Sequence, residues 1–322
     1  MKSALVLLLG VAAATALPSA TNLYTISLAE LQQAVATGRT ANINRALHNV
    51  GAIAVSGLGA RYAQGVESLR VNNPNCLKGS LRVKLTDGVE RFSHIQSNSE
   101  EPPRCIKTDY EAILDGFNTV EDQITEALGQ LVGNSSLLVK ENMQIKKTSQ
   151  LETKTHVHTY INKDTVQSEE ITNPYSLPFH QDNGLWLLMT PADVLPVVMK
   201  TRAGQLVSTE QLSSDTAMFL VGRGLTDWLL QDTANSFIAP PHAVQSLAGS
   251  GIAQRTVMAR MKIAEYDATP ALTGGLTYME SLELHESICP LAAAGHYSPG
   301  GPLSEEEAKD DKKRAFLLNF YY

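Results

Sequence analysis

Aromatic residues, cysteines and long apolar runs are all scarce in this sequence. Aromatic residues make up 6% of the 322 residues, and there are three cysteines. The formal net charge is −7 and no basic stripe with interleaved aromatic residues occurs, which argues against nucleic-acid binding. Beyond the first twenty residues no apolar run is long enough to cross a membrane, so we expect no stable membrane insertion. What remains is a globular composition, 43% hydrophobic, sufficient for a core in one large domain or two.

The first sixteen residues have the pattern of a secretory signal peptide. Lys2 precedes the apolar run of residues 4–9, and the small residues Ala14 and Ala16 frame a cleavage site of the expected kind. Cleavage after Ala20 is an alternative, and a buried N-terminal helix is the competing interpretation of the whole segment. The pattern predicts a protein of the secretory-pathway lumen or the cell exterior.

The cysteines and one glycosylation triplet bear on the same prediction. Cys76 and Cys105 flank a polar region and could close a loop in an oxidising compartment, which would leave Cys289 over. Three free thiols are the alternative. Asn134 begins an N-glycosylation triplet, a pattern that also arises by chance and adds little.

The N-terminal region, residues 17–150, is expected to be mainly helical. Capping signals and apolar spacing predict helices that end at glycines, at residues 27–38, 43–50 and 109–132. The apolar run at residues 52–55 is typical of a strand packed on the first two helices, and residues 72–106 are polar and predicted to be irregular.

The character of the sequence changes near residue 151. From there to residue 265 it breaks into short strand-like runs, at residues 156–161, 185–189, 194–200, 205–209, 216–221, 236–239 and 255–263. Many short strands separated by polar turns favour a sandwich or jelly roll. Residues 266–322 form a C-terminal extension, in which residues 304–307 should open a last, charged helix.

Within this strand region, His180 and Asp182 form a His-x-Asp pair. In an extended chain residues i and i+2 point to the same side, so an imidazole and a carboxylate could bind one ion. His242, which follows the run at residues 236–239, is the candidate third ligand. Two histidines and one carboxylate form the facial triad of non-haem Fe(II) oxygenases. The alternative is that all three are ordinary turn residues.

The stretch from about residue 23 to residue 265 resembles the iron(II)/2-oxoglutarate-dependent dioxygenases, in particular their isopenicillin N synthase-like branch. The resemblance lies in an ordered set of segments: "INRALHNVGAIAVSGLG", "HQDNGLWLLM", "LPVVMKTRAGQLVST", "AMFLVGRGLTDWL", "FIAPPHAV" and "QRTVMARMKI". It implies an α+β fold with a double-stranded β-helix (jelly-roll) core, against which the N-terminal helices pack. The dioxygenase domain would be residues 151–265.

The resemblance also implies roles for individual residues. His180, Asp182 and His242 would bind Fe(II), and no further catalytic side chain is expected. Arg255 would pair with the distal carboxylate of 2-oxoglutarate, because a guanidinium binds a carboxylate through two parallel hydrogen bonds. Tyr160 would lie near the same carboxylate. The alternative for Arg255 is a surface position, with Arg260 as its competitor.

The stretch after the arginine departs from the family pattern. The family usually has a serine two residues after its arginine, and Val257 stands there in this chain. The hydroxyl would then come from Thr256 or be missing, and this puts the use of 2-oxoglutarate in question more than the use of iron.

The implied reaction consumes O₂ and 2-oxoglutarate and passes through a ferryl species that takes hydrogen from a small-molecule substrate. Hydroxylation, desaturation or ring closure would follow. Two alternatives stay open: a secreted non-catalytic binding or structural protein on the same scaffold, and an iron oxidase that does not use 2-oxoglutarate. The substrate and the oligomeric state are not readable from the sequence.

Overall fold

The computed structural model describes residues 21–70, 81–85, 87–97, 101–131, 151–163, 174–192, 197–209, 212–230, 237–248, 250–264, 268 and 276–282. Cys105 is disulfide-bonded. Several predictions fall outside the described residues: the signal peptide, the glycosylation triplet, the last helix, Cys76 and Cys289. No helix in the described ranges is long and apolar enough to span a membrane.

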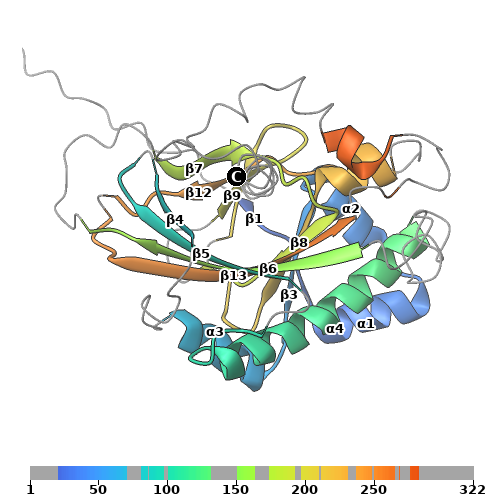
Figure 1. The fold of residues 1–322 in the computed structure, drawn as a ribbon. Coiled ribbons are helices and arrows are strands. Elements are labelled where there is room, and N and C mark those ends of the chain that lie inside the picture. The colour runs from blue at the N-terminus through green and yellow to red at the C-terminus, as the bar shows by residue number, and fades with distance from the viewer. Residues whose placement is uncertain are drawn as a thin grey trace, which may run out of the picture.

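Two β-sheets face each other in the centre of the molecule (Figure 1). The smaller sheet has five strands in the order β1 (Thr21–Asn22), β10 (Leu206–Ser208), β9 (Val197–Lys200), β12 (His242–Gln245) and β7 (Tyr175–His180). The larger sheet has eight, in the order β2 (Thr25–Ser27), β3 (Ala52–Ser56), β11 (Ala217–Val221), β8 (Trp186–Met189), β13 (Gln254–Ala264), β6 (Leu151–Ile161), β5 (Glu90–Ser97) and β4 (Leu81–Lys84). All neighbouring strands are antiparallel except β1–β10 and β2–β3.

Helices cover the outer face of the larger sheet, so the fold is mixed α+β as predicted (Figure 1). They are α1 (Leu28–Thr37), α3 (Ala60–Arg70) and α4 (Lys107–Leu131). Helix α2 (Ala41–Asn49) lies instead at the end of the sheets (Figure 1), where the carbonyls of Leu47 and Asn49 accept from the amides of Ile238 and Arg202, and a short π-helix, η3 (Gly224–Leu229), follows β11. Helix α1 begins with the predicted capping box between Ser27 and Glu30 and ends at Gly38, whose φ of 67° suits a residue without a side chain. Helix α4 buries its predicted apolar stripe against the sheet.

Two local predictions are wrong, and one helix was not predicted. Strands β4 and β5 lie inside the stretch predicted to be irregular, because β4 is an edge strand whose side chains alternate between half-buried and exposed and therefore read as polar. Helix α3 was not expected at all. The run predicted as a strand at residues 236–239 contains no strand in its described part, and β12 begins only at His242.

Strand β13 contributes side chains to both faces of the larger sheet. It pairs with β6 along its whole length and with β8 over part of it, and most of its eleven residues are buried. Because successive side chains alternate, one set faces the smaller sheet and the other set faces α4. The first set lines the pocket between the sheets.

Candidate metal and cosubstrate site

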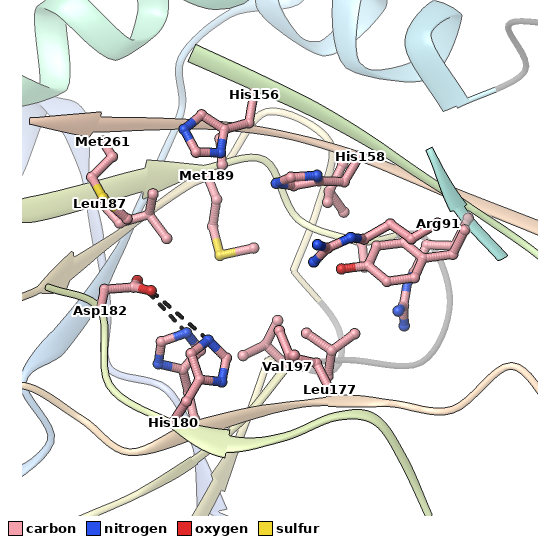
Figure 2. Close-up of a pocket in the computed structure, with 17 residues that line it drawn as sticks. Arg91, His156, His158, Leu177, His180, Asp182, Leu187, Met189, Val197 and Met261 are labelled. Atoms are coloured by element: carbon pink, nitrogen blue, oxygen red, sulfur yellow. Dashed lines mark ion pairs between the residues drawn. The ribbon is translucent and has the colours of Figure 1, made fainter. Parts of the chain in front are cut away.

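A pocket between the two sheets contains the residues that the sequence singled out (Figure 2). The smaller sheet and the turn after it supply His180, Asp182 and His242, and the larger sheet supplies Tyr160 and Arg255. The remaining lining residues are mostly aliphatic or Met, namely Leu177, Leu187, Met189, Ala192, Val197, Val244, Val257, Ala259 and Met261. The pocket therefore has a polar end on each side of an apolar middle.

The antiparallel pairing of β7 and β12 brings the two histidines together. His180 is the last residue of β7 and His242 the first of β12, and they are direct cross-strand partners. Their ring centroids lie 4.3 Å apart. Asp182 completes the group, with Oδ1 3.8 Å from Nε2 of His180 and Oδ2 3.7 Å from Nε2 of His242 (Figure 2). The pairing of β7 with β12 thus brings together two residues that are 62 positions apart in the chain.

Both histidines are oriented by a hydrogen bond to the backbone carbonyl of the residue two positions earlier in the chain. Nδ1 of His180 lies 2.9 Å from the carbonyl oxygen of Pro178, and Nδ1 of His242 lies 3.1 Å from that of Pro240. A carbonyl oxygen can only accept, so each Nδ1 carries the proton and Nε2 of the neutral ring keeps its lone pair toward Asp182. Burial lowers the pKa of His180 to about 4, and the neighbouring His242 acts in the same direction. A hydrogen bond of this kind is typical of metal-binding histidines.

Asp182 lies in a turn that packs closely against the backbone of Gly222 and Gly224. The amide of Arg223 donates to the carbonyl of Asp182 at 2.8 Å, and that of Gly224 donates to Gly184 at 3.0 Å. A side chain on Gly222 or Gly224 would collide with the backbone of residues 183–184. The segment "GRG" after β11 therefore positions the carboxylate, a role that sequence reasoning did not assign.

The donor set fits a metal ion. His180, Asp182 and His242 each offer one ligand atom, and these atoms lie within 4.8 Å of one another. Oδ2 of Asp182 is buried and has no hydrogen-bond partner among the described residues, which is costly for a carboxylate oxygen unless a cation is bound. Two imidazoles and a carboxylate leave open coordination positions and suit Fe(II). In the described ranges this is the only cluster of three such residues that could hold a metal.

Arg255 and Tyr160 lie together in the same pocket. They are cross-strand partners on β13 and β6, and the guanidinium carbon of Arg255 lies 4.4 Å from the centre of the Tyr160 ring. Arg255 is 1% exposed and donates to the carbonyl of Gln245 at 3.1 Å. The surface alternative for Arg255 is therefore wrong, because its side chain is buried and lines the pocket.

The prediction that Thr256 supplies a hydroxyl to this site is wrong. Because side chains alternate along β13, Thr256 points to the opposite face of the sheet from Arg255. Its hydroxyl lies 3.2 Å from that of Thr159, and it does not line the pocket. Val257 faces the pocket instead, so this position contributes an apolar surface. The competitor Arg260 also faces away and pairs with Glu121 of α4.

Three further pocket residues were missed or left undecided. His156 and His158 line the pocket from β6, with Nδ1 of His158 2.9 Å from the hydroxyl of Ser93. Burial lowers the pKa of His156 to about 3 and that of His158 well below its usual value, so both rings are neutral. Arg91 reaches into the pocket from β5, and the sequence carried no signal for it because its strand was predicted to be irregular.

Comparisons with known proteins identify solved structures that have a similar fold. No protein-family model matches the sequence, and no curated protein matches it. Solved structures do resemble it. The dioxygenase for auxin oxidation from rice has 18% sequence identity and a TM-score of 0.56 over 83% of this chain and 96% of that one.

Two other solved structures are similar to the same extent. A Neurospora crassa protein, solved at full length in complex with α-ketoglutarate (2-oxoglutarate), has 12% identity and a TM-score of 0.56 over 80% of this chain and 90% of that one. JOX2, solved with 2-oxoglutarate, Fe and JA, has 14% identity and a TM-score of 0.55 over 77% of each chain. This chain therefore has the fold of the 2-oxoglutarate- and iron-dependent oxygenases, and the predicted likeness is confirmed at that level. The isopenicillin N synthase-like branch is not distinguished and stays a prediction.

Proposed function

We propose that the protein is an Fe(II)/2-oxoglutarate-dependent oxygenase whose two facing sheets form a double-stranded β-helix. The convergence of His180, Asp182 and His242 on one point of an apolar pocket is the observation that carries the proposal. The likeness to oxygenases solved with 2-oxoglutarate supports it. We further propose that the N-terminal segment directs the protein to the secretory pathway or the cell exterior.

The metal would be held by Nε2 of each histidine and by the Asp182 carboxylate. Together with O₂ and 2-oxoglutarate, bound iron supplies the oxidising power to break a C–H bond of the substrate. The carbonyls of Pro178 and Pro240 keep both Nε2 lone pairs directed at the metal position. The low pKa of His180 keeps its ring available as a ligand at neutral pH, because a protonated imidazole cannot bind a cation.

The distal carboxylate of 2-oxoglutarate would be bound by Arg255. The carbonyl of Gln245 and the ring of Tyr160 hold the guanidinium at one end of the pocket, so it does not have to be ordered when the anion arrives. Tyr160, 3% exposed, would add its phenol to the same subsite. The aliphatic and Met side chains between the two ends exclude water and strengthen both electrostatic contacts. A small-molecule substrate would occupy the rest of this space.

An anaerobic titration tests the proposal. The purified protein is mixed with Fe(II) and then with 2-oxoglutarate, the visible charge-transfer band of the chelate is recorded, and succinate is measured after air is admitted. We expect the band and succinate in the wild type and neither in His242→Ala. A wild-type protein that takes up no iron would contradict the proposal and favour a non-catalytic binding protein on the same scaffold.

A second candidate function is an iron-dependent oxidase that does not use 2-oxoglutarate. Val257 favours it, because an apolar side chain faces the pocket two residues after Arg255, where the resembling family usually has a hydroxyl. The same titration separates the two: iron uptake without the band and without succinate would support the oxidase.

A further inference from the structure

A third histidine of the pocket differs from the two proposed metal ligands in its hydrogen bond. His158 of β6 lines the pocket, and its ring points into it (Figure 2). Its Nδ1 lies 2.9 Å from the hydroxyl of Ser93, its cross-strand partner on β5. A hydroxyl can donate as well as accept, whereas the carbonyls that contact His180 and His242 can only accept. The tautomer of His158 is therefore set by what the Ser93 hydroxyl requires.

The hydroxyl of Ser93 requires an acceptor for its proton. Ser93 is 3% exposed and is not among the described residues that line the pocket. Within the described ranges, its hydroxyl has no hydrogen-bond partner other than His158. If Nδ1 of His158 carried the ring proton, the hydroxyl proton would be buried without an acceptor, which is unfavourable. The hydroxyl therefore donates to Nδ1, and the ring proton lies on Nε2.

The ring of His158 is neutral and has this one donor. Burial lowers its pKa well below the usual value, and the charges of Arg91 and His156 act in the same direction. Its Nε2 has no hydrogen-bond partner among the residues that the structure describes. His158 thus presents an N–H group to the pocket, whereas His180 and His242 present lone pairs to the metal position. An N–H group cannot bind a cation, and it suits an acceptor oxygen of a ligand.

The position of this donor places it beside the proposed 2-oxoglutarate subsite. His158 lies two residues from Tyr160 on β6, and its partner on β13 is Val257, two residues from Arg255. Residues i and i+2 of a strand point to the same side, about 7 Å apart. His158 and Val257 therefore form a second row beside the row of Tyr160 and Arg255. Val257 has no hydrogen-bonding side chain, so His158 is the donor of this pair.

The metal position lies beyond the second row as seen from Arg255. The turn that carries Asp182 packs against Met261 of β13, because a side chain on Gly184 would collide with it. Val257 lies between Arg255 and Met261 on the same strand. A 2-oxoglutarate molecule that joins the metal position to Arg255 must therefore pass the second row.

We propose that His158 donates its Nε2 hydrogen to a carboxylate oxygen of 2-oxoglutarate, and so supplies from β6 a hydrogen bond that Val257 on β13 cannot give. Ser93 is a positioning residue, because its hydroxyl fixes the ring proton on Nε2. The inference rests on the proposed function, since it requires 2-oxoglutarate in the pocket. The tautomer does not depend on that function and can be measured without any ligand.

The first test measures the tautomer in the metal-free wild-type protein. Long-range ¹H–¹⁵N correlation spectra of the histidine rings distinguish a protonated nitrogen from one with a free lone pair, and the signals of His158 are those missing from His158→Phe. We expect the proton on Nε2 in the wild type and a mixture of both tautomers in Ser93→Ala. A wild-type ring with its proton on Nδ1 would overturn the inference.

The second test measures the Kd for 2-oxoglutarate from the visible band of the Fe(II)-loaded protein under anaerobic conditions. His158→Phe keeps a planar ring without the N–H group and should weaken binding about 10- to 100-fold, the effect of one hydrogen bond to a charged group. His158→Gln keeps a neutral donor and should recover part of the loss. Thr159→Val is the matched control and should stay within about 3-fold of wild type, because its hydroxyl lies 3.2 Å from that of Thr256, away from the pocket.

A rescue experiment separates a ligand contact from a structural role. Val257→Ser places a hydroxyl in the pocket directly across from position 158. Added to His158→Phe, it should restore most of the lost affinity for 2-oxoglutarate, because the donor is replaced from the other strand. A loss in His158→Phe that Val257→Ser does not reduce would overturn the inference, since packing damage on β6 cannot be repaired in this way.

The outcomes also separate this inference from the proposed function. A wild-type protein that forms no band with 2-oxoglutarate would overturn both together. A normal band, with the same Kd in His158→Phe as in the wild type, would overturn the inference alone and leave the proposed function in place.

Discussion

Strand β13 carries two buried arginines five residues apart, and the two have different surroundings. Arg260, 6% exposed, faces the helices, pairs with Glu121 of α4 and donates to Asn118 at 2.6 Å. Arg255, 1% exposed, faces the pocket between the sheets and lies against Tyr160. Burial therefore does not distinguish the arginine paired with Glu121 from the one proposed to bind 2-oxoglutarate. The surroundings of the side chain do, because Arg260 is paired with the carboxylate of Glu121, whereas Arg255 lies in the pocket that also contains His180, Asp182 and His242.

The residues next to these two arginines also differ between the helix face and the pocket face of the sheet. On the helix face, Glu121 also accepts from Trp186 at 2.9 Å and lies 3.7 Å from Lys262, so one carboxylate joins α4 to two strands. On the pocket face, the polar groups converge on space that a metal and small molecules would fill. We expect substitutions on the helix face to lower stability and those on the pocket face to lower ligand affinity.

Arg255→Gln should give the largest effect on ligand binding. Removing the guanidinium leaves a carboxylate of 2-oxoglutarate without its partner in an apolar pocket, which should weaken binding about 100-fold or more. The Kd for 2-oxoglutarate is measured by anaerobic titration of the Fe(II)-loaded protein. Arg260→Gln is the matched control and should stay within about 3-fold of wild type. Equal losses in both variants would contradict the division between the faces.

Arg260→Met should give the largest effect on stability. It leaves the Glu121 carboxylate, whose side chain is 13% exposed, with Lys262 as its remaining cation, and we expect the free energy of unfolding to fall by about 3 kcal/mol. Urea denaturation of the metal-free protein measures this change. If Arg255→Gln destabilised the protein as strongly, the pocket face would have to be regarded as structural too.

The buried histidines of the pocket face predict a dependence of stability on pH. The folded-state pKa of His156 is about 3 and the unfolded value is about 6.5, so the unfolded state binds the proton first as the pH falls. Stability is then lost progressively from about pH 6.5 toward pH 3, and this residue accounts for about 2 kcal/mol between pH 7 and pH 5. The His156→Asn variant should show a correspondingly shallower decline in urea denaturation across that range. Identical declines would contradict a folded-state pKa this far below the unfolded one.

Thr256→Val should give the smallest effect. Its hydroxyl contacts Thr159 on the far side of the sheet, so the affinity for 2-oxoglutarate should not change, and the lost hydrogen bond should lower stability by about 1 kcal/mol. A clear loss of 2-oxoglutarate affinity would place this hydroxyl in the pocket after all.

The three residues predicted as metal ligands lie together in the structure, whereas of the three predicted to bind 2-oxoglutarate, Arg255 and Tyr160 line the pocket and Thr256 does not. The spacing of His180 and Asp182 has a simple geometric consequence in an extended chain. His242 was chosen because it follows the strand-like run at residues 236–239, although the described part of that run contains no strand. The role suggested for Thr256 failed on the same alternation rule, because it adjoins Arg255 and must face the other way.

Arg91 was out of reach of sequence reasoning for a different reason. Its strand forms the polar edge of the sheet together with β4, and no local pattern distinguishes an arginine that turns inward there from one exposed to solvent. Only the pairing of β5 with β6 places it beside Tyr160.

The most direct measurement is the iron content of the protein after anaerobic loading and removal of free metal, in the wild type, Asp182→Ala and His242→Ala. We expect about one Fe(II) per chain in the wild type and almost none in either variant, because a site of three protein ligands loses most of its affinity with any one of them. Variants that remain folded and bind iron as tightly as the wild type would show that His180, Asp182 and His242 are not the metal site.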